Sequence, residues 1–462
     1  MTLQLTRVVP PAAALGRFST LRALIRNPIE AWPAELYEQP YLRRRTLRTP
    51  TLFLCDPELV REAVVEQAEN FTRTTSLKRG GLQPILGNGL LTTDGAAWRW
   101  QRRTASPLFR HDRLLGFVPA MQAAAAATLA RLHALPAGTE VELGRVMMRT
   151  TFDIILATML ADGGGMEASR VEAAVNDLLG SAGWRAALAL MGAPSWMPFP
   201  GRARALAART LLRRMVADAV ERGAQRNNGE AERAADLLGH LAQAHDPETG
   251  APMDRERVID NILTFILAGH ETTALALTWS FYLLSHHPGI AAAAREEVQS
   301  VAGEAPLTQA DLPRLVLTRQ IAMEAMRLYP PAGAIGRLAV RDLTVGSLPV
   351  PVNTLVIIPI YAIHRHRALW DAPDQFDPAR FAPEAAAARH RYAYLPFGAG
   401  PHTCIGMNFA LMEAIVILAT LLQGVRLRLR PGHDPGMRLR ITLRPARGMP
   451  MTVERAKGIE PS

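Results

Sequence analysis

The stretch FGAGPHTCIG, residues 397–406, holds three glycines, a proline, a histidine and one of the two cysteines of the chain. It directly precedes an apolar run with helical character, MNFALMEAIVILATLL, residues 407–422. A cysteine that only fills a core is usually surrounded by apolar side chains. Flexible glycines let the backbone approach a ligand closely, and the N-terminus of a following helix stabilises a thiolate. By itself the stretch leaves two interpretations open, an inert cysteine or a thiolate that binds iron.

Composition narrows the class of protein. The chain has 462 residues, of which 48% are hydrophobic and 20% charged, as in ordinary globular proteins. Cys55 and Cys404 are too few and too far apart for a disulfide framework, which favours a reducing compartment such as the cytoplasm. We find no run of about 18 apolar residues and therefore expect no transmembrane segment. The net charge of +10 is spread over dispersed arginines, which indicates an anionic protein or cofactor as partner and no nucleic acid.

The order of patterns along the chain predicts the fold class. Residues 1–40 contain several prolines and no period, so we expect an extended lead-in. Helical patterns dominate up to residue 327, including a long, mostly apolar pattern at 254–287 that predicts a helix through the centre of the protein. A short strand-like pattern comes at residues 43–54, and the other alternating patterns come late, from residue 335 onward. The prediction is a mainly α protein with a smaller β region, one domain over 41–455 and a frayed tail over 456–462.

Polar residues interrupt the long central helix at AGHETT, residues 268–273. Helical spacing places Ala268, Glu271 and Thr272 on one face. The Thr272 hydroxyl can donate to the carbonyl of residue 268, and an acid beside an alcohol makes a short path for protons. A polar contact between helices is the other interpretation. The segment HETTA is not a zinc site, because Ala274 stands where H-E-x-x-H has its second histidine.

Two further segments predict structural roles. Glu324 and Arg327 of EAMR are neighbours on one helix face, and Arg380 of FDPARF (residues 376–381) can complete a buried triad with them. Such a triad acts as a structural lock, because breaking a buried ion pair is costly. His364 and His366, in the segment HRHR, are expected to be hydrogen-bonded or at the surface.

Six segments occur together in a recognisable order: WRWQR (98–102), AGHETT, EAMR, RLAVRD (337–342), FDPARF and FGAGPHTCIG. In this order and at these separations they resemble the cytochrome P450 family, and the resemblance runs from about residue 52 to 453. It implies the cytochrome P450 fold, a single triangular domain with a long central helix. The implied cofactor is haem b (heme b, iron protoporphyrin IX).

The resemblance also implies a role for individual residues. Cys404 resembles the proximal thiolate ligand of the haem iron, and Phe397 is expected beside its sulfur. The residues that resemble donors to the haem propionates are Trp98, Arg102, Arg337 and His402. Glu271 and Thr272 resemble the acid and alcohol that relay protons to iron-bound dioxygen. His402 replaces an arginine found in much of the family, so this propionate contact is expected to be pH-sensitive.

The implied activity is that of a bacterial, cytoplasmic monooxygenase. It inserts one oxygen atom of O2 into an apolar small molecule, such as a fatty acid or a terpenoid. Electrons are expected from a separate ferredoxin or flavodoxin with its reductase, and the protein is expected to be a monomer. A haem-thiolate peroxygenase or isomerase, or a haem sensor that is not an enzyme, would keep Cys404 and bypass the proton relay, so Glu271 and Thr272 favour the monooxygenase.

Overall fold

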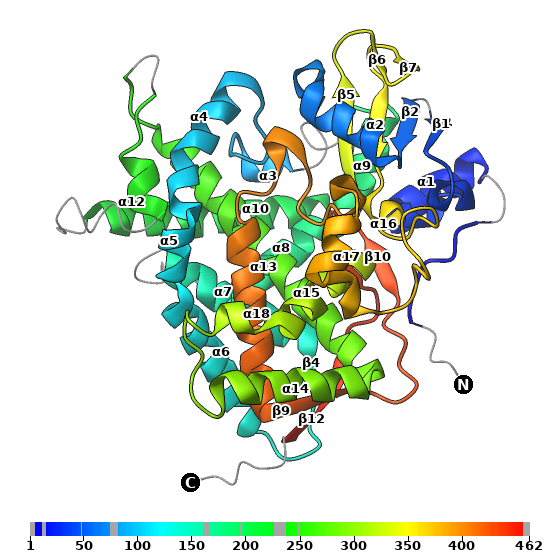
Figure 1. Cartoon of the computed structure of the whole chain (residues 1–462). Helices are drawn as coiled ribbons and strands as arrows, with labels where there is room; N and C mark the ends of the chain where they lie inside the picture. Colours follow the sequence, from blue (N-terminus) through cyan, green and yellow to red (C-terminus); the bar gives the residue numbers. More distant parts are fainter. Residues whose placement is uncertain are drawn as a thin grey trace.

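The computed structural model describes residues 5–11, 15–47, 49–73, 82–159, 167–194, 196–225, 237–246 and 250–455. The α-helices are α1 (Arg17–Arg26), α2 (Pro57–Arg61), α3 (Gln83–Leu86), α4 (Gly95–Ala105), α5 (His111–Leu115), α6 (Val118–His133), α7 (Leu143–Met159), α8 (Ala168–Gly180), α9 (Ala182–Leu190), α10 (Arg202–Gln225), α12 (Leu237–Ala242), α13 (Arg255–His286), α14 (Pro288–Ala302), α15 (Val316–Leu328), α16 (Ile360–Ile363), α17 (Pro383–Ala388) and α18 (Met407–Gly424). The strands are β1 (Tyr41–Thr46), β2 (Thr49–Leu54), β3 (Phe71–Arg73), β4 (Glu140–Glu142), β5 (Ile335–Ala339), β6 (Leu343–Val345), β7 (Leu348–Val350), β8 (Leu355–Ile358), β9 (Val425–Leu429), β10 (Met437–Leu439), β11 (Leu443–Pro445) and β12 (Pro450–Arg455). Helices make up most of the molecule (Figure 1), which confirms the predicted fold class.

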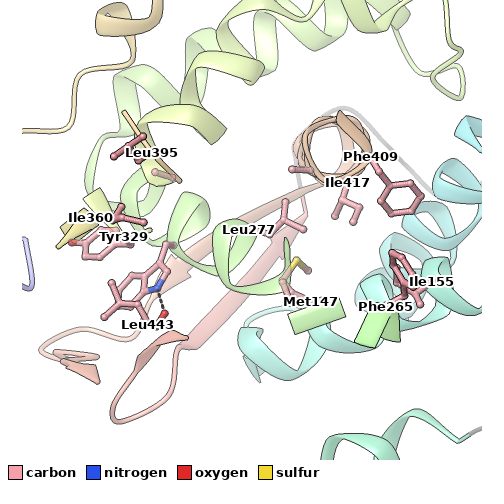
Figure 2. Packing of buried hydrophobic residues seen from close by; sticks show 14 of the residues in the cluster. Met147, Ile155, Phe265, Leu277, Tyr329, Ile360, Leu395, Phe409, Ile417 and Leu443 are labelled. Atoms are coloured by element: carbon pink, nitrogen blue, oxygen red, sulfur yellow. Dashed lines mark hydrogen bonds between the residues drawn. The ribbon is translucent and has the colours of Figure 1, made fainter. Parts of the chain in front are cut away.

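The long helix α13 lies at the centre of the molecule (Figure 1), where the apolar pattern predicted it. It begins after Asp254, whose carboxylate accepts a hydrogen bond of 2.8 Å from the Arg257 amide, and it ends before Pro288. Nearly every side of it is buried. Figure 2 shows its Phe265 beside Ile155 of α7 and its Leu277 near Met147 of α7. A helix apolar on almost all sides needs such cover from several neighbours.

The N-terminal segment differs from the prediction. Residues 1–40 were expected to be extended, but residues 17–26 form the helix α1, which packs on α9. Two short 3-10 turns follow, η1 (Pro28–Ala31) and η2 (Ala34–Tyr37). Apolar side chains of this part, such as Ile29, Trp32 and Leu36, are buried against the rest of the protein. Tertiary packing therefore orders a segment that has no period of its own, while residues 456–462, expected to be frayed, lie outside the described residues.

The main sheet joins strands from both ends of the chain, in the order β1-β2-β8-β5-β3. Strand β2 pairs in parallel with β8, whereas β5 runs antiparallel to both β8 and β3. Strands β1 and β2 confirm the strand-like pattern at residues 43–54, whereas β3 was not expected, so the prediction of a late β region was incomplete. The register of β3 and β5 sets Arg73 directly opposite Arg337. A second sheet has the order β4-β12-β9, and two antiparallel pairs, β6–β7 and β10–β11, complete the sheets of the described residues.

Three helices of the described chain have the length and hydropathy of a membrane span: His111–His133, Arg255–His286 and Met407–Gly424. The expectation that no segment is long and apolar enough was therefore wrong. Two of the three are mostly inside the protein, with 78% of the apolar window buried for α13 and 72% for α18. Burial in the core explains their hydropathy, since a helix surrounded by other helices is apolar on all sides. The window in His111–His133 is 33% buried.

Candidate active site

Cys404 lies in the turn just before α18. Its amide donates a 2.9 Å hydrogen bond to the Phe397 carbonyl, and the Gly406 amide donates to its sulfur. The side chain is exposed to solvent even though protein atoms surround it closely enough to desolvate the thiol, so the sulfur lies below the outer surface with one open side. Burial raises the pKa of Cys404, while the Gly406 amide and the Arg102 guanidinium lower it.

The other cysteine shows the contrasting environment. Cys55 is fully buried, its thiol donates to the Leu36 carbonyl at 3.3 Å, and burial raises its pKa to about 12. An inert core cysteine looks like this. Cys404 has an accessible sulfur that accepts from an N–H group and feels the charge of a guanidinium, and both of these favour a thiolate against the effect of burial.

The glycines of the Cys404 turn have a structural cause that the sequence did not suggest. Gly400 has a φ of +72°, and a Cβ there would lie 1.9 Å from the Val64 carbonyl oxygen. Gly398 also has a positive φ, of +73°. We expected these glycines to admit a flat cofactor. Gly400 is instead required by its left-handed backbone and by the close approach of the segment 62–66.

A group of aromatic and basic side chains surrounds the approach to Cys404. Trp98 and Arg102 come from α4, with the Trp98 ring 4.0 Å from the His402 ring, centroid to centroid. Arg73 Nη2 lies 2.6 Å from His402 Nδ1. Because a guanidinium can only donate, Nδ1 accepts, and His402 is a neutral ring that carries its hydrogen on Nε2. Burial, followed by the charges of Arg73 and Arg337, lowers the pKa of His402 to about 3, so it stays neutral at physiological pH, against the expectation of a pH-sensitive donor.

The same group carries more positive charge than the protein neutralises. Burial lowers the pKa of Arg73 to about 10, Asp94 opposes this shift, and Arg337 and Arg102 add to it. Burial also lowers the pKa of Arg337 and of Arg102. Among the described residues, the carboxylate of Asp94 lies beside this cluster, 3.7 Å from Arg73 Nε. Arg73 is buried and Arg102 and Arg337 are half-buried, and guanidinium groups that repel one another away from water are stabilised by an anion between them, so the site fits a cofactor that carries carboxylates.

Arg73 was missed by the sequence analysis. It is buried, it donates to the Leu90 carbonyl at 2.8 Å, and it belongs to the cluster only because β3 pairs with β5. No local pattern around residue 73 distinguishes it from other arginines. The only signal that could have found it is the pairing register of two strands more than 250 residues apart, and a single sequence does not reveal it.

The two residues predicted to relay protons have different surroundings. Thr272 Oγ1 donates to the Ala268 carbonyl at 2.7 Å, as predicted, and both residues lie on the accessible side of α13. The Glu271 side chain is buried and accepts from Arg444 Nε at 2.7 Å and from the Thr442 hydroxyl. The carboxylate of Glu271 is therefore tied to the β10–β11 hairpin and its connection, an arrangement closer to the alternative of a polar contact between elements.

Arg444 extends this contact to α8. Its Nη1 donates to the Asn176 side-chain oxygen at 2.8 Å, so Arg444 connects α13 to α8 through the C-terminal hairpin. The sequence analysis did not identify Arg444. Its signal is weak, because the alternating run that holds it, MRLRITLRP (residues 437–445), contains several arginines.

The predicted structural lock is present. Glu324 and Arg327 form a 2.7 Å ion pair with both side chains fully buried, and Arg380 Nε lies 3.5 Å from Glu324. Arg327 also donates to the His364 carbonyl at 2.8 Å. His364 is buried, burial lowers its pKa to about 3, and it accepts from the Leu395 amide at 2.7 Å. The lock thus holds the start of the segment that leads to Cys404, and His364 is hydrogen-bonded as expected.

Comparison with known proteins agrees with this arrangement. The family model described as Cytochrome P450 matches residues 32–450. Cyclooctatin synthase of Streptomyces melanosporofaciens is 33% identical, over 87% of this chain and 86% of its own length. Pentalenene oxygenase of Streptomyces avermitilis is 32% identical, over 89% of each chain, and a cytokinin hydroxylase of Arabidopsis thaliana is 31% identical, over 88% of this chain and 79% of its own. The chain belongs to the cytochrome P450 family.

Family membership establishes the general chemistry. Proteins of this family bind haem b and use O2 and a redox partner to oxidise apolar substrates. The relatives are named as oxygenases, monooxygenases and hydroxylases, so this chain is an oxidoreductase that incorporates oxygen.

Proposed function

We propose that this protein is a haem-thiolate monooxygenase that hydroxylates an apolar small molecule, and that residues 41–455 form the domain that does so. One observation carries the proposal. An accessible cysteine sulfur that accepts an amide hydrogen bond lies beside a cluster of one buried and two half-buried arginines, whose charges an anion would compensate. Haem b has an iron for the sulfur and two carboxylates for the arginines.

Cys404 is the proposed ligand of the haem iron. When bound through a thiolate, haem favours cleavage of the O–O bond of dioxygen. The chain contributes the hydrogen bond from the Gly406 amide, which limits how much charge the sulfur donates, and the Arg102 guanidinium, which favours the thiolate over the thiol. Phe397, whose carbonyl accepts from the Cys404 amide, is the proposed cover of the sulfur.

The basic cluster is the proposed site of the propionates. The sequence predicted four of its members, namely Trp98, Arg102, Arg337 and His402. The structure adds Arg73 as a fifth. His402 contributes Nε2–H as a neutral donor, because Arg73 already occupies its Nδ1. Arginine suits carboxylates because its planar fork can donate two parallel hydrogen bonds.

Thr272 and Glu271 are the proposed proton relay. The Thr272 hydroxyl donates a hydrogen bond to the Ala268 carbonyl. The lone pairs of the Thr272 oxygen therefore remain on the accessible side of α13, where they can accept from a donor and hold it in place. Glu271 is an acid one residue away, but its carboxylate is paired with Arg444. Delivery of a proton by Glu271 therefore requires that this ion pair opens, and a movement of α8 that withdraws Asn176 from Arg444 would favour the opening.

A terpenoid is the proposed substrate class, with a fatty acid as the alternative. Pentalenene oxygenase, cyclooctat-9-en-7-ol 5-monooxygenase and 11-oxo-beta-amyrin 30-oxidase are among the relatives, and their names support the terpenoid. The proposed contacts are Ala268, Ala334, Ile335 and the neighbourhood of Thr442, together with the regions 71–91 and 184–199, of which residues 74–81 and 195 lie outside the described chain.

A separate ferredoxin or flavodoxin with its reductase is the proposed source of electrons. The protein itself is proposed to be a monomer in the bacterial cytoplasm. The positive charge of the chain and its low cysteine content support this assignment. A candidate docking face lies beside the Cys404 turn, where a Cβ on Gly406 would lie 3.7 Å from the Phe109 ring and the exposed Arg110 and Arg113 follow Phe109.

A haem-thiolate peroxygenase is the second candidate, favoured by the pairing of Glu271 with Arg444. Such an enzyme inserts one oxygen atom of a peroxide into the substrate and releases the other as water. Because a peroxide is already two electrons more reduced than O2, no separate reductant is needed. Comparing turnover with hydrogen peroxide against turnover with O2, NADH and redox partner separates the two. Faster turnover with peroxide would replace the monooxygenase by this alternative.

The iron–sulfur bond is the decisive test of the proposal. We expect the reduced protein with carbon monoxide to show the red-shifted absorption of thiolate-ligated haem, and Cys404→Ser to lose it completely. Cys55→Ser is the matched control, because it changes the buried cysteine and should leave the spectrum as it is. Retention of the shifted band in Cys404→Ser would contradict the proposal.

A further inference from the structure

A second cationic site lies outside the haem region, where the N-terminal segment crosses the loop after α16 (Figure 1). The Val8 amide reaches the Tyr361 hydroxyl at 3.4 Å there. A cavity of about 120 Å³ opens between the N-terminal segment, η2 and this loop. Its polar walls come from Arg7, Tyr37, Arg365, Arg367 and Asp374. This volume holds several water molecules or one small ion.

Arg365 is the most buried cation of the cavity wall, with 5% of its surface exposed. Its guanidinium lies 4.0 Å from the centre of the Tyr361 ring and 5.7 Å from that of Tyr329, so stacking fixes its orientation. Neither Nε nor Nη1 makes a hydrogen bond to any residue that the structure describes. The nearest carboxylate oxygen, of Asp374, is 3.4 Å from Nε. A held guanidinium with unused N–H groups is prepared to bind an acceptor.

Tyr37 supplies a second unused donor. Its hydroxyl is buried and has no hydrogen-bond partner within the described part of the chain. Burial raises the pKa of Tyr37 well above its usual value, so the hydroxyl keeps its proton and can donate. Buried hydroxyl groups are nearly always satisfied by protein or by a bound molecule, so this one indicates that something binds in the cavity.

The charges around the cavity favour an anion. Arg7 pairs with Asp374, and Arg367 pairs with Glu38. With Arg365, three guanidinium groups thus face two carboxylates, which leaves one positive charge in excess. The unused groups are also all donors, so water could accept from them but would leave its own hydrogens with few acceptors, whereas an ion with several acceptor oxygens satisfies them together.

We propose that this cavity binds one small oxyanion, a carboxylate or a phosphate, which accepts hydrogen bonds from Arg365 Nη1 and from the Tyr37 hydroxyl. The ion joins the N-terminal segment to the loop after α16. That loop begins beside His364, which holds the Leu395 amide of the segment leading to Cys404. The site is separate from the proposed oxygenation chemistry and does not depend on it.

Equilibrium dialysis of the full-length, haem-loaded protein tests the site. Radiolabelled inorganic phosphate is used in one arm and radiolabelled acetate in the other, with sodium chloride holding the ionic strength constant. We expect saturable binding of one ion per chain in at least one arm, and the arm with the tighter binding identifies the source. Tyr37→Phe removes a single oxygen and should weaken binding about tenfold, as loss of a donor to a charged acceptor does.

The matched control is Tyr394→Phe, since Tyr394 is a half-buried tyrosine whose hydroxyl already donates to the Met323 carbonyl at 2.8 Å. It should bind the ion as the unmodified protein does. Arg365→Lys keeps the charge but loses the geometry, and it should bind at least tenfold more weakly; if this variant does not fold, Tyr37→Phe decides alone. Absence of saturable binding of both ions, or equal affinity of Tyr37→Phe and the unmodified protein, would overturn the proposal.

Discussion

At the scale of single residues, the neighbours of a side chain decide its chemistry. His402 is a histidine whose titration is suppressed, because burial and the adjacent guanidinium groups oppose a second proton. Cys404 and Cys55 have the same thiol, yet only Cys404 has an accessible sulfur that accepts from an amide and feels the charge of a guanidinium. Thr272 is held by its own helix, whereas Glu271 is held by a distant hairpin.

Thr272→Ala tests the relay at this scale. We expect electrons still to be consumed while product formed per electron falls roughly tenfold or more, because a positioned proton donor contributes at least this much. Thr272→Ser keeps the hydroxyl and should retain most of the coupling. Thr278→Val removes the same kind of bond, a 2.7 Å contact to the Ala274 carbonyl, at a fully buried position of α13, and should leave coupling unchanged. Equal coupling in Thr272→Ala and the unmodified protein would exclude the assignment.

At the scale of elements, buried charges hold helices to the loops beside them. The pair of Glu324 and Arg327 connects α15 to the segment around His364 and to the 3-10 turn η9 (Pro378–Phe381). A different case is Glu413 of α18, fully buried with no hydrogen bond of good geometry to its carboxyl oxygens among the described residues, although Thr273 of α13 lies beside it. The charge of the Glu324 carboxylate is compensated by Arg327, whereas the Glu413 carboxyl avoids a buried charge by keeping its proton.

Arg327→Met should lower the free energy of unfolding by about 3–5 kcal/mol, because it leaves the Glu324 carboxylate buried without its partner. Urea unfolding followed by circular dichroism measures the change. Arg61→Met is the matched control, since its 2.7 Å pair with Glu58 is exposed, and it should change the free energy by less than about 1 kcal/mol. Equal losses in the two variants would show that the buried lock is no stronger than a surface pair.

Glu413 predicts a pH dependence. Burial raises its pKa from 4.5 to about 8, so between these values the folded protein holds a proton that the unfolded chain releases. Stability must then fall as pH rises through this window. Glu413→Gln imitates the neutral acid and should gain about 3–5 kcal/mol relative to the unmodified protein between pH 4.5 and 8. Urea titrations across this range measure the gain.

The exposed Glu384 provides the control for Glu413. The free energy of unfolding of Glu384→Gln should change with pH in the same way as that of the unmodified protein. A constant difference between Glu413→Gln and the unmodified protein would mean that the carboxyl titrates normally, with its charge compensated.

At the scale of the whole molecule, the excess of positive charge has two proposed uses. Part of this positive charge lies in the cluster around Arg73, where we propose that it binds the haem carboxylates. Another part is at the surface near the Cys404 turn. Long-range attraction between this surface and an acidic partner would raise the rate of encounter.

Arg110→Gln combined with Arg113→Gln should lower the rate constant for reduction by an acidic ferredoxin several-fold at low salt, with the difference shrinking as salt screens the charges. Stopped-flow absorbance of the haem measures this rate. The control removes two exposed arginines from β9, Arg426→Gln with Arg428→Gln, which lie beyond the end of α18 that is far from the Cys404 turn. Equal rates for the two double variants would contradict docking at the Cys404 face.

The sequence alone determined the features that depend on neighbours along one helix or turn. It identified the mainly α class, the long central helix, the Thr272 bond and the pair of Glu324 and Arg327. These follow from i, i+3 and i, i+4 spacing, which helix geometry sets wherever the helix forms. The resemblance to a family then led from these features to Cys404.

Only the tertiary structure decided the contacts between distant segments. Arg73 joins the basic cluster through the register of β3 and β5, and Glu271 meets Arg444 because the C-terminal hairpin packs on α13. The pairing of β2 with β8 and the packing of α1 on α9 are also contacts between distant segments. Such contacts depend on which elements pack together and in which register, and a shift of one residue in a strand turns every side chain to the other face. No local pattern in a single sequence encodes that choice.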